Sequence, residues 1–296
     1  MSRFVKRLMI IAWCLAASIA LADEDVSRTV EASEDGLVTI SNPVGSIDVK
    51  GWSREQVEVK GELGRNVEEL VFERNGNEVK VLVKTRGESL RGSSSDLHIR
   101  VPSNSSLKVV GVSADITTSD VHGSQRLQTV SGDVDTYAFE EDIDIESVSG
   151  DIAVRGGGKE LHATVGSVSG DIDVTRLSGT LAARSISGNI AISEGSFARA
   201  GVNTTSGDIL FEAALAGKGR LDIETINGGV EVELRGKLSA RFDIETFHGD
   251  IRNCFGPEAQ RTSRYAPGRE LVFTEGSGDG RVTIRTLNGD LSLCRD

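Results

Sequence analysis

The feature that most constrains this fold is a Ser-Gly-Asp tripeptide, or a close variant, that recurs along the chain at almost constant intervals. Successive glycines are 18 to 21 residues apart, and the last interval is 40 residues, which is about two units. A fixed period of this length is typical of repeat proteins, in which each unit packs only on its neighbours. The glycine position is held by Gly132, Gly150, Gly170, Gly188, Gly207, Gly228, Gly249 and Gly289.

Three other positions of the repeat are almost as regular. The residue after the glycine is Asp133, Asp151, Asp171, Asn189, Asp208, Gly229, Asp250 or Asp290. Three residues before the glycine a small hydroxyl stands in all eight units, and two residues before it the side chain is mostly aliphatic. Glycine adopts positive φ easily, the Asp can accept a backbone N–H bond in an Asx turn, and the hydroxyl can satisfy an unpaired backbone group. These residues are therefore interpreted as structural turns.

Between the turns, apolar and polar residues alternate, which indicates β strands with one buried face. Leu221-Asp222-Ile223 and Val230-Glu231-Val232 show the period of two. From Ile223 to Ile226 the spacing becomes three, which predicts a bend there. One unit cannot bury its own apolar face, but stacked units can, with strands about 4.8 Å apart.

The sequence therefore predicts an all-β, single-stranded β-solenoid (β-helix) whose coils match the repeat of 18 to 21 residues. The count of 34 glycines and the 4% aromatic content agree with many tight turns around an aliphatic core. A right-handed winding is favoured, because the six-residue period of left-handed solenoids is absent. The N-terminal β section is less regular than the rest.

Residues 1–22 are predicted to be a cleaved signal peptide. A basic start is followed by about a dozen apolar residues and by Ala20-Leu21-Ala22, a small-x-small cleavage pattern. The apolar run is too short to span a membrane, and the mature chain shows no later span. The protein is therefore expected to be exported, to the periplasm or the cell surface. Its net charge of −12 becomes more negative on cleavage, which argues against a nucleic-acid partner.

The mature chain is interpreted as one continuous domain, because no linker-like stretch divides it. Residues 23–110 form the N-terminal β section, which continues into regular solenoid repeats over 111–252. Residues 253–296 are predicted to form a capping loop or hairpin and the last coil. The two cysteines of the mature chain, Cys254 and Cys294, both stand five residues after a repeat glycine, so we expect a disulfide between them, with two free thiols as the alternative.

The residues that could carry chemistry are few. Stacked carboxylates of the Asp column could chelate Ca²⁺, but Asn189 and Gly229 interrupt the column, so turn capping is favoured. No catalytic residue, metal site or cofactor is predicted. Residues 253–281 break the repeat and hold a local basic cluster, a candidate for partner binding or for capping: Arg261, Arg264, Tyr265 and Arg269.

Several motifs resemble a known family. The repeated Ser-Gly-Asp-Ile units, the Gly-Ser-Ile-Asp-Val-Lys-Gly-Trp of residues 45–52 and the Thr-Leu-Asn-Gly-Asp-Leu of residues 286–291 are similar to the bacterial "putative adhesin" β-strand-repeat family. That family is a domain of unknown function found in envelope and exported proteins, and the similarity spans roughly residues 35–296. It implies the fold and the envelope location, and it offers no catalytic residues.

These observations predict a non-enzymatic exported scaffold, an adhesin or binding protein of the envelope whose partner is a protein, a glycan or another envelope component. One alternative is a carbohydrate-active β-helix enzyme with its site near 253–281. Another is an envelope-stress or regulatory component.

Overall fold

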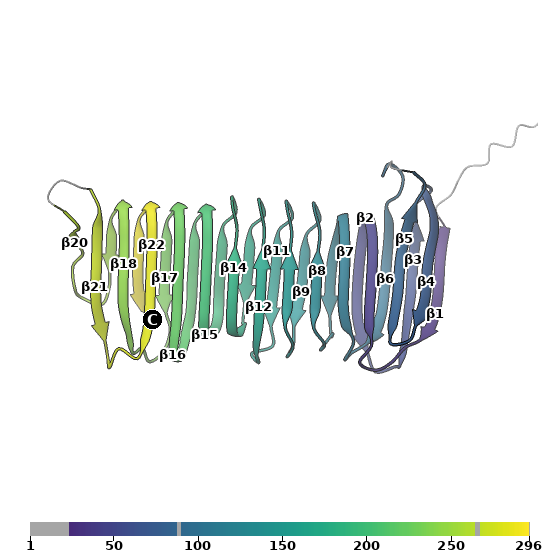
Figure 1. The fold of residues 1–296 in the computed structure, drawn as a ribbon, viewed down its shortest axis with the longest axis horizontal. Helices are drawn as coiled ribbons and strands as arrows, with labels where there is room; N and C mark the ends of the chain where they lie inside the picture. Colours follow the sequence, from purple (N-terminus) through teal and green to yellow (C-terminus); the bar gives the residue numbers. More distant parts are fainter. Residues whose placement is uncertain (1–23, 88–89, 264–266, 296) are drawn as a thin grey trace, which may run out of the picture.

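The computed structural model describes residues 24–87, 90–263 and 267–295. It is a rod in which all regular elements of this part of the chain are β strands (Figure 1). The strands of the N-terminal end are β1 (Glu24–Glu31), β2 (Leu37–Trp52), β3 (Gln56–Leu63), β4 (Val67–Asn75), β5 (Glu78–Thr85), β6 (Ser95–Pro102) and β7 (Ser106–Ser119). Those of the middle are β8 (Gln125–Gln128), β9 (Val134–Ala138), β10 (Ile143–Glu146), β11 (Ile152–Gly156), β12 (Glu160–Gly166), β13 (Ile172–Thr175), β14 (Ser178–Arg184), β15 (Ile190–Ser206) and β16 (Ile209–Asn227). Those of the C-terminal end are β17 (Val230–Leu234), β18 (Ala240–His248), β19 (Ile251–Asn253), β20 (Gln260–Arg261), β21 (Arg269–Glu275), β22 (Gly280–Asn288) and β23 (Leu291–Arg295).

Each regular unit is a rung with two sides that meet at the Ser-Gly-Asp corner. In one rung β10 forms the first side and β11 the second, and each pairs in parallel with its counterpart in the rungs before and after. We call the first sides together sheet 1, which contains β8, β10, β12, β14, β22 and β18, and the second sides sheet 2, which contains β9, β11, β13, β17, β23 and β19. The long strands β2, β7, β15 and β16 turn a corner and contribute to both sheets.

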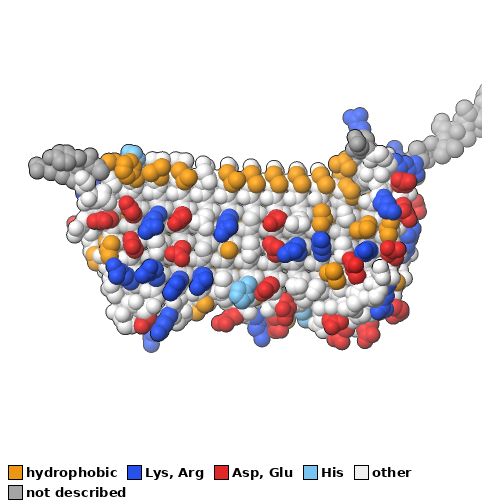
Figure 2. All heavy atoms as spheres, viewed as in Figure 1, with side chains coloured by type: hydrophobic (Ala, Val, Ile, Leu, Met, Phe, Trp, Pro, Cys, Tyr) orange, Lys and Arg blue, Asp and Glu red, His pale blue; other side chains and the backbone are white. Residues whose placement is uncertain are grey.

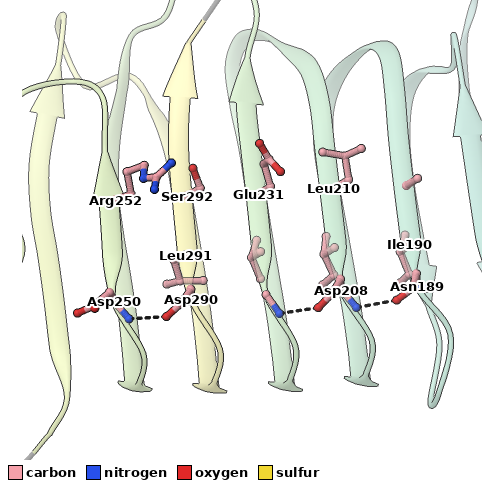
Figure 3. A pocket seen from close by; sticks show the side chains of 14 residues that line it. Asn189, Ile190, Asp208, Leu210, Glu231, Asp250, Arg252, Asp290, Leu291 and Ser292 are labelled. Atoms are coloured by element: carbon pink, nitrogen blue, oxygen red, sulfur yellow. Dashed lines mark hydrogen bonds between the residues drawn. The ribbon is translucent and has the colours of Figure 1, made fainter.

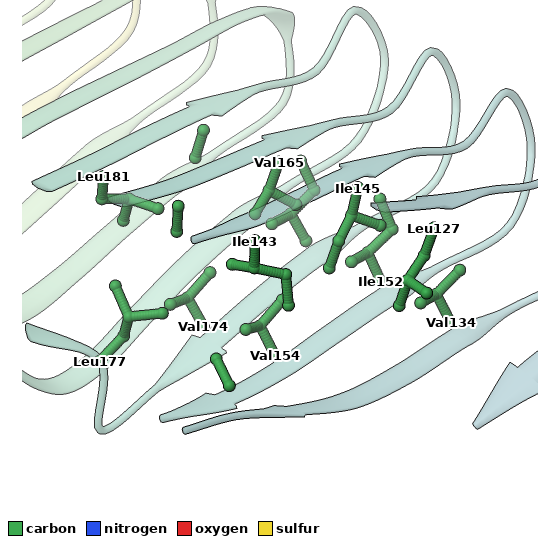
Figure 4. Packing of buried hydrophobic residues seen from close by; sticks show 14 of the residues in the cluster. Leu127, Val134, Ile143, Ile145, Ile152, Val154, Val165, Val174, Leu177 and Leu181 are labelled. Atoms are coloured by element: carbon green, nitrogen blue, oxygen red, sulfur yellow. The ribbon is translucent and has the colours of Figure 1, made fainter. Parts of the chain in front are cut away.

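The core lies between the two sheets and runs the length of the rod. Figure 4 shows how Ile143 and Ile145 of one side face Ile152 and Val154 of the other, and all four are at most 2% exposed. Burying such a side chain fully stabilises the fold by about 1.5–3 kcal/mol. Each side of a rung is a single strand, so its apolar side chains are buried only where the rung before it and the rung after it cover them.

At the N-terminal end, the order of rungs in space differs from their order in the chain. Strand β2 lies between β7 on one side and the rung formed by β5 and β6 on the other. Antiparallel strands then cover this end, with β4 on β5, β3 on β6 and β1 on β3.

The C-terminal end repeats this arrangement. The last rung of the chain, β22 and β23, is inserted between the rung of β16 and β17 and the rung of β18 and β19. Figure 1 shows β22, in yellow, among strands that all precede it in the sequence. Strand β21 pairs with β18 in antiparallel fashion, and β20 with β21, so that a hairpin covers this end as well.

The structure confirms an all-β solenoid of stacked rungs. The right-handed winding and the predicted boundaries at residues 22, 110 and 252 stay predictions. Among the residues described, no helix is long and apolar enough to cross a membrane.

Candidate functional site

The Asp column forms a ladder of hydrogen bonds along one corner of the rod (Figure 3). The backbone N–H of Asp151 donates to Oδ1 of Asp133 at 2.9 Å, and the same bond recurs along the column with distances of 2.7 to 3.0 Å. The carboxylate therefore accepts from the next rung, and not from its own turn as the Asx-turn interpretation had it. Each side chain fastens one rung to the following one.

The hydroxyl three residues before the glycine also bonds at the corner. Ser147 Oγ accepts the N–H of Gly150 at 2.9 Å, and Ser167 and Ser185 do the same in their own rungs. Several of these hydroxyls also reach the carbonyl oxygen of the preceding rung, as Thr246 does to Gly289 at 3.0 Å. Side chains thus satisfy backbone groups that the corner removes from the strand ladders.

The repeat glycines are required for a different reason from the one inferred from sequence. Of the repeat glycines, only Gly249 has a positive φ, at 153°. At each of the remaining corners, a Cβ added to the glycine would overlap the carbonyl group of the preceding rung. At Gly170 this Cβ would lie 2.6 Å from the carbonyl carbon of Gly150. Close stacking of backbones, and not the left-handed region of φ, excludes larger residues here.

The aliphatic residue two positions before the glycine points outward and forms the most regular apolar feature of the surface. In β16 the alternation continues through this point, because Thr225 takes the inward position and Ile226 the outward one, and the chain bends at Gly228. In the rungs of β8, β10, β12 and β14 the bend predicted from the spacing begins at the residue equivalent to Ile226. We call the resulting row the exposed ridge; its members are between 39% and 51% exposed, and in spatial order they are Val112, Val130, Val148, Val168, Ile186, Ile226, Leu287 and Phe247.

The exposed ridge runs along one edge of the molecule and is visible as the upper orange row in Figure 2. Thr205 interrupts it once, between Ile186 and Ile226. Backbone bonds such as Ser131 N–H to the Val112 carbonyl, at 2.8 Å, hold successive members in adjacent rungs. An apolar row of this length has no role in the core, and extended exposed apolar surfaces mark interaction sites.

A shallow groove runs across sheet 2 beside the Asp ladder, near the C-terminal end of the rod. Figure 3 shows Glu231, Ser292 and Arg252 side by side on consecutive rungs in it. The carboxylates of Asp208 and Asp290, which border it, accept inter-rung bonds, and no cluster of three or more potential metal ligands occurs among the described residues. The groove therefore offers shape and mixed charge.

The basic cluster of residues 253–281 is only partly brought together. Arg261 is exposed and opposes Arg269 in the antiparallel pair of β20 and β21. The guanidinium of Arg269 forms an ion pair with Asp250 at 2.8 Å. Arg264 and Tyr265 lie outside the described residues. The role of this cluster in partner binding stays a prediction.

Cys254 and Cys294 form a disulfide that joins two adjacent rungs of the rod end. Cys294 lies in the inserted strand β23, and Cys254 follows β19, the outermost strand of sheet 2. The bridge closes a sequence separation of 40 residues. It therefore fastens the last rung of the chain into its internal position.

The amino-acid sequence assigns the chain to a known family. A family model described as Toastrack DUF4097 matches residues 47–294. The chain belongs to the Toastrack DUF4097 family. No curated protein matches this Toastrack chain in sequence.

Among solved structures similar to this Toastrack protein, one is described as a "putative lipid binding protein" from Parabacteroides distasonis, 14% identical with a TM-score of 0.49. It covers 92% of this chain, which covers 96% of it. Another, described as a "putative adhesin" from the same organism, is 13% identical with a TM-score of 0.41, at coverages of 92% and 97%.

The sequence contained a signal for the exposed ridge. Leu221, Ile223 and Thr225 share one face at a period of two, so Ile226 had to lie on the other. The interpretation of the spacing did not extend the alternation to the hydroxyl residue, which takes the buried place: Thr225 is 5% exposed.

Proposed function

We propose that this protein is an exported, non-enzymatic binding scaffold of the bacterial cell envelope, and that its exposed ridge contacts the partner. The observation that carries the proposal is the ridge itself, because an apolar row kept outward over nearly the whole rod serves neither folding nor solubility. The predicted signal peptide supports export, and the disulfide suits an oxidising compartment.

The chemistry of the corners supports a scaffold over an enzyme. Carboxylates of the Asp ladder are engaged in bonds between rungs, which fixes them in place and leaves them as structural acceptors. Turn glycines are needed for stacking. The regular rungs thus use their polar groups to build a straight rod, and the feature that they present outward at constant spacing is the apolar ridge.

The ridge is tested with a charged double variant, Val148→Glu with Val168→Glu, in the purified protein. The matched control is Leu37→Glu with Val272→Glu, which places the same charges at exposed aliphatic positions off the ridge. We expect both variants to keep the far-UV spectrum and melting temperature of the parent. Co-sedimentation with isolated cell envelopes should fall at least tenfold for the ridge variant and stay unchanged for the control.

Equal retention of both variants on envelopes would refute the role of the ridge. Export is tested separately, by N-terminal sequencing of the protein recovered outside the cytoplasm, which should begin at Asp23. Turnover of a polysaccharide by the purified protein would contradict the non-enzymatic assignment.

A further inference from the structure

Sheet 1 carries a row of four arginines on four adjacent strands near the C-terminal end of the rod. Register pairs Arg199 of β15 with Arg220 of β16, Arg220 with Arg281 of β22, and Arg281 with Arg241 of β18. All four side chains are exposed on the outer face, and Figure 2 shows a row of blue side chains along the lower left of this face. We call this row the arginine ladder.

The arginine ladder has no internal counter-charge. Elsewhere on the rod, arginines pair with acids on the neighbouring rung, as Arg126 does with Asp144 at 3.0 Å and Arg155 with Asp135 at 2.8 Å. Within the described part of the chain, none of the four ladder arginines has a carboxylate within ion-pair distance. Like charges placed directly opposite on adjacent strands destabilise a sheet. An acidic protein of net charge −12 thus concentrates uncompensated positive charge in one line.

The surroundings of the ladder restrict the width of any anionic ligand. Two residues further along β16 and β18 lie Asp222 and Asp243, and four residues further lie Glu224 and Glu245, with Arg285 of β22 between them. A membrane surface or a duplex nucleic acid is broad, so its charges would meet these carboxylates as well as the arginines. A single narrow chain lying along the ladder would avoid them.

On the other flank the surface is mixed. Lys218 is exposed and close enough to Asp279 to help lower the pKa of that carboxyl, after the larger effects of hydrogen bonds from Ser277 and Ser239. Lys237 is exposed there too. This flank therefore carries charges of both signs, and the acidic flank bounds the ladder on the other side.

The spacing and the chemistry of the ladder identify a ligand class. Adjacent strands place one guanidinium about every 4.8 Å along the rod, so alternate arginines are about 10 Å apart. This spacing is close to the two-sugar repeat at which an extended polyuronate returns its carboxylates to the same side. A guanidinium forms two parallel hydrogen bonds with a carboxylate, which makes arginine well suited to carboxylate recognition. We propose that the arginine ladder binds a single chain of an acidic polysaccharide, through hexuronic-acid carboxylates that follow the axis of the rod.

This inference rests on the proposed binding function and deepens it, because it names a ligand class for a second surface. The ladder exists only in the assembled fold. Arg281 is the residue that joins Arg220 to Arg241, and it does so because β22 is inserted out of sequence order.

The test uses polymannuronate oligomers of at least four sugars, with mannuronate and the methyl-esterified polymer as ligand controls. The variant is Arg220→Gln with Arg281→Gln, and the matched control is Arg126→Gln with Arg155→Gln, which removes the same charge from arginines outside the ladder. We expect titration at low ionic strength to show at least tenfold weaker binding for the ladder variant and parental binding for the control. Binding should weaken as salt increases, and the monomer and the ester should bind much more weakly.

Each outcome decides the proposal. If the wild-type protein does not bind polymannuronate at low salt, if the ester binds equally well, or if both double variants lose binding alike, the proposal is wrong. Stronger binding of anionic vesicles or of single-stranded DNA than of polymannuronate would also overturn it. Should the ladder variant fold poorly, Arg199→Gln at the end of the row gives the same readout. The failure of this proposal can be distinguished from the failure of the ridge proposal, because the Glu variants of the ridge should bind polymannuronate as the parent does.

Discussion

Replacing Gly170 by alanine tests whether close stacking of rungs is what requires glycine at the corners. The added Cβ would overlap the carbonyl group of Gly150, with the carbonyl carbon 2.6 Å away and Ser167 Oγ at 3.0 Å. The rungs would have to separate by about 1 Å, which stretches the hydrogen bonds beyond their useful range. Two bonds between rungs lie at this point, from Ser169 N–H to the Val148 carbonyl at 2.9 Å and from Asp171 N–H to Asp151 Oδ1 at 2.8 Å.

Loss of one neutral bond and one bond to a carboxylate predicts a destabilisation of about 2–4 kcal/mol for Gly170→Ala. The matched control is Gly158→Ala in the loop between β11 and β12. Gly158 has a φ of 79° with nothing within 4 Å of the added Cβ, so only the backbone preference is lost, about 1 kcal/mol.

The two variants are compared by urea unfolding followed by far-UV circular dichroism. Because a stacked rod can open locally, exchange of the Asp171 amide hydrogen is measured as well, and it should accelerate only in Gly170→Ala. A loss of stability for Gly170→Ala that is no larger than the loss for Gly158→Ala would refute the stacking argument.

Other perturbations have equally definite outcomes. Cys294→Ser removes a bridge across 40 residues and should lower stability by about 3–4 kcal/mol, while the intact mass of the parent should rise by two protons on reduction; free thiols in the native protein would contradict the pairing. Phe242→Ala should destabilise the hairpin end by about 3–5 kcal/mol, because Phe242 is fully buried and stacks on Phe273 with ring centroids 4.4 Å apart. Phe247→Ala should cost less than about 1 kcal/mol, because Phe247 is 43% exposed. Gln125→Leu should cost about 2 kcal/mol, since buried Gln125 accepts from Thr118 at 2.7 Å and from Thr136 at 3.1 Å; unchanged stability would mean that these hydroxyls find other acceptors.

Much of the fold was predictable, because the sequence of each rung contains the same pattern of apolar, hydroxyl and glycine residues. The alternation and the hydroxyl before the glycine recur in every unit, and they indicated strands, turns and a stacked core without knowledge of neighbours. The inter-rung role of the Asp side chains was out of reach, since the tripeptide alone does not distinguish a bond within a turn from a bond to the next coil. The reason for the glycines was out of reach too, because the tripeptide alone does not distinguish a need for positive φ from close stacking on the neighbouring rung.

The order of the rungs could not be predicted, for a physical reason. Rungs with the same hydrophobic pattern can pair with one another almost interchangeably, so local sequence does not say which follows which in space. The arginine ladder has one feature that the sequence shows and one that depends on the order of the rungs. Arg199, Arg220, Arg241 and Arg281 all stand eight residues before a repeat glycine, a signal present in the sequence. That Arg281 lies between Arg220 and Arg241 follows only from the inserted strand β22.

The interleaved ends also limit how such a rod can change in length. An array whose units follow one another in space can gain or lose a unit at either tip. Here the tips are interlocked, since β2 and the pair β22 and β23 each fill a slot between segments that lie elsewhere in the chain. A unit duplicated at a tip would separate β2, or β22 and β23, from one of the rungs with which they now pair. A unit added among β8 to β14 would meet matching neighbours on both sides. The middle of the rod is thus the part that evolution, or an engineer, can lengthen.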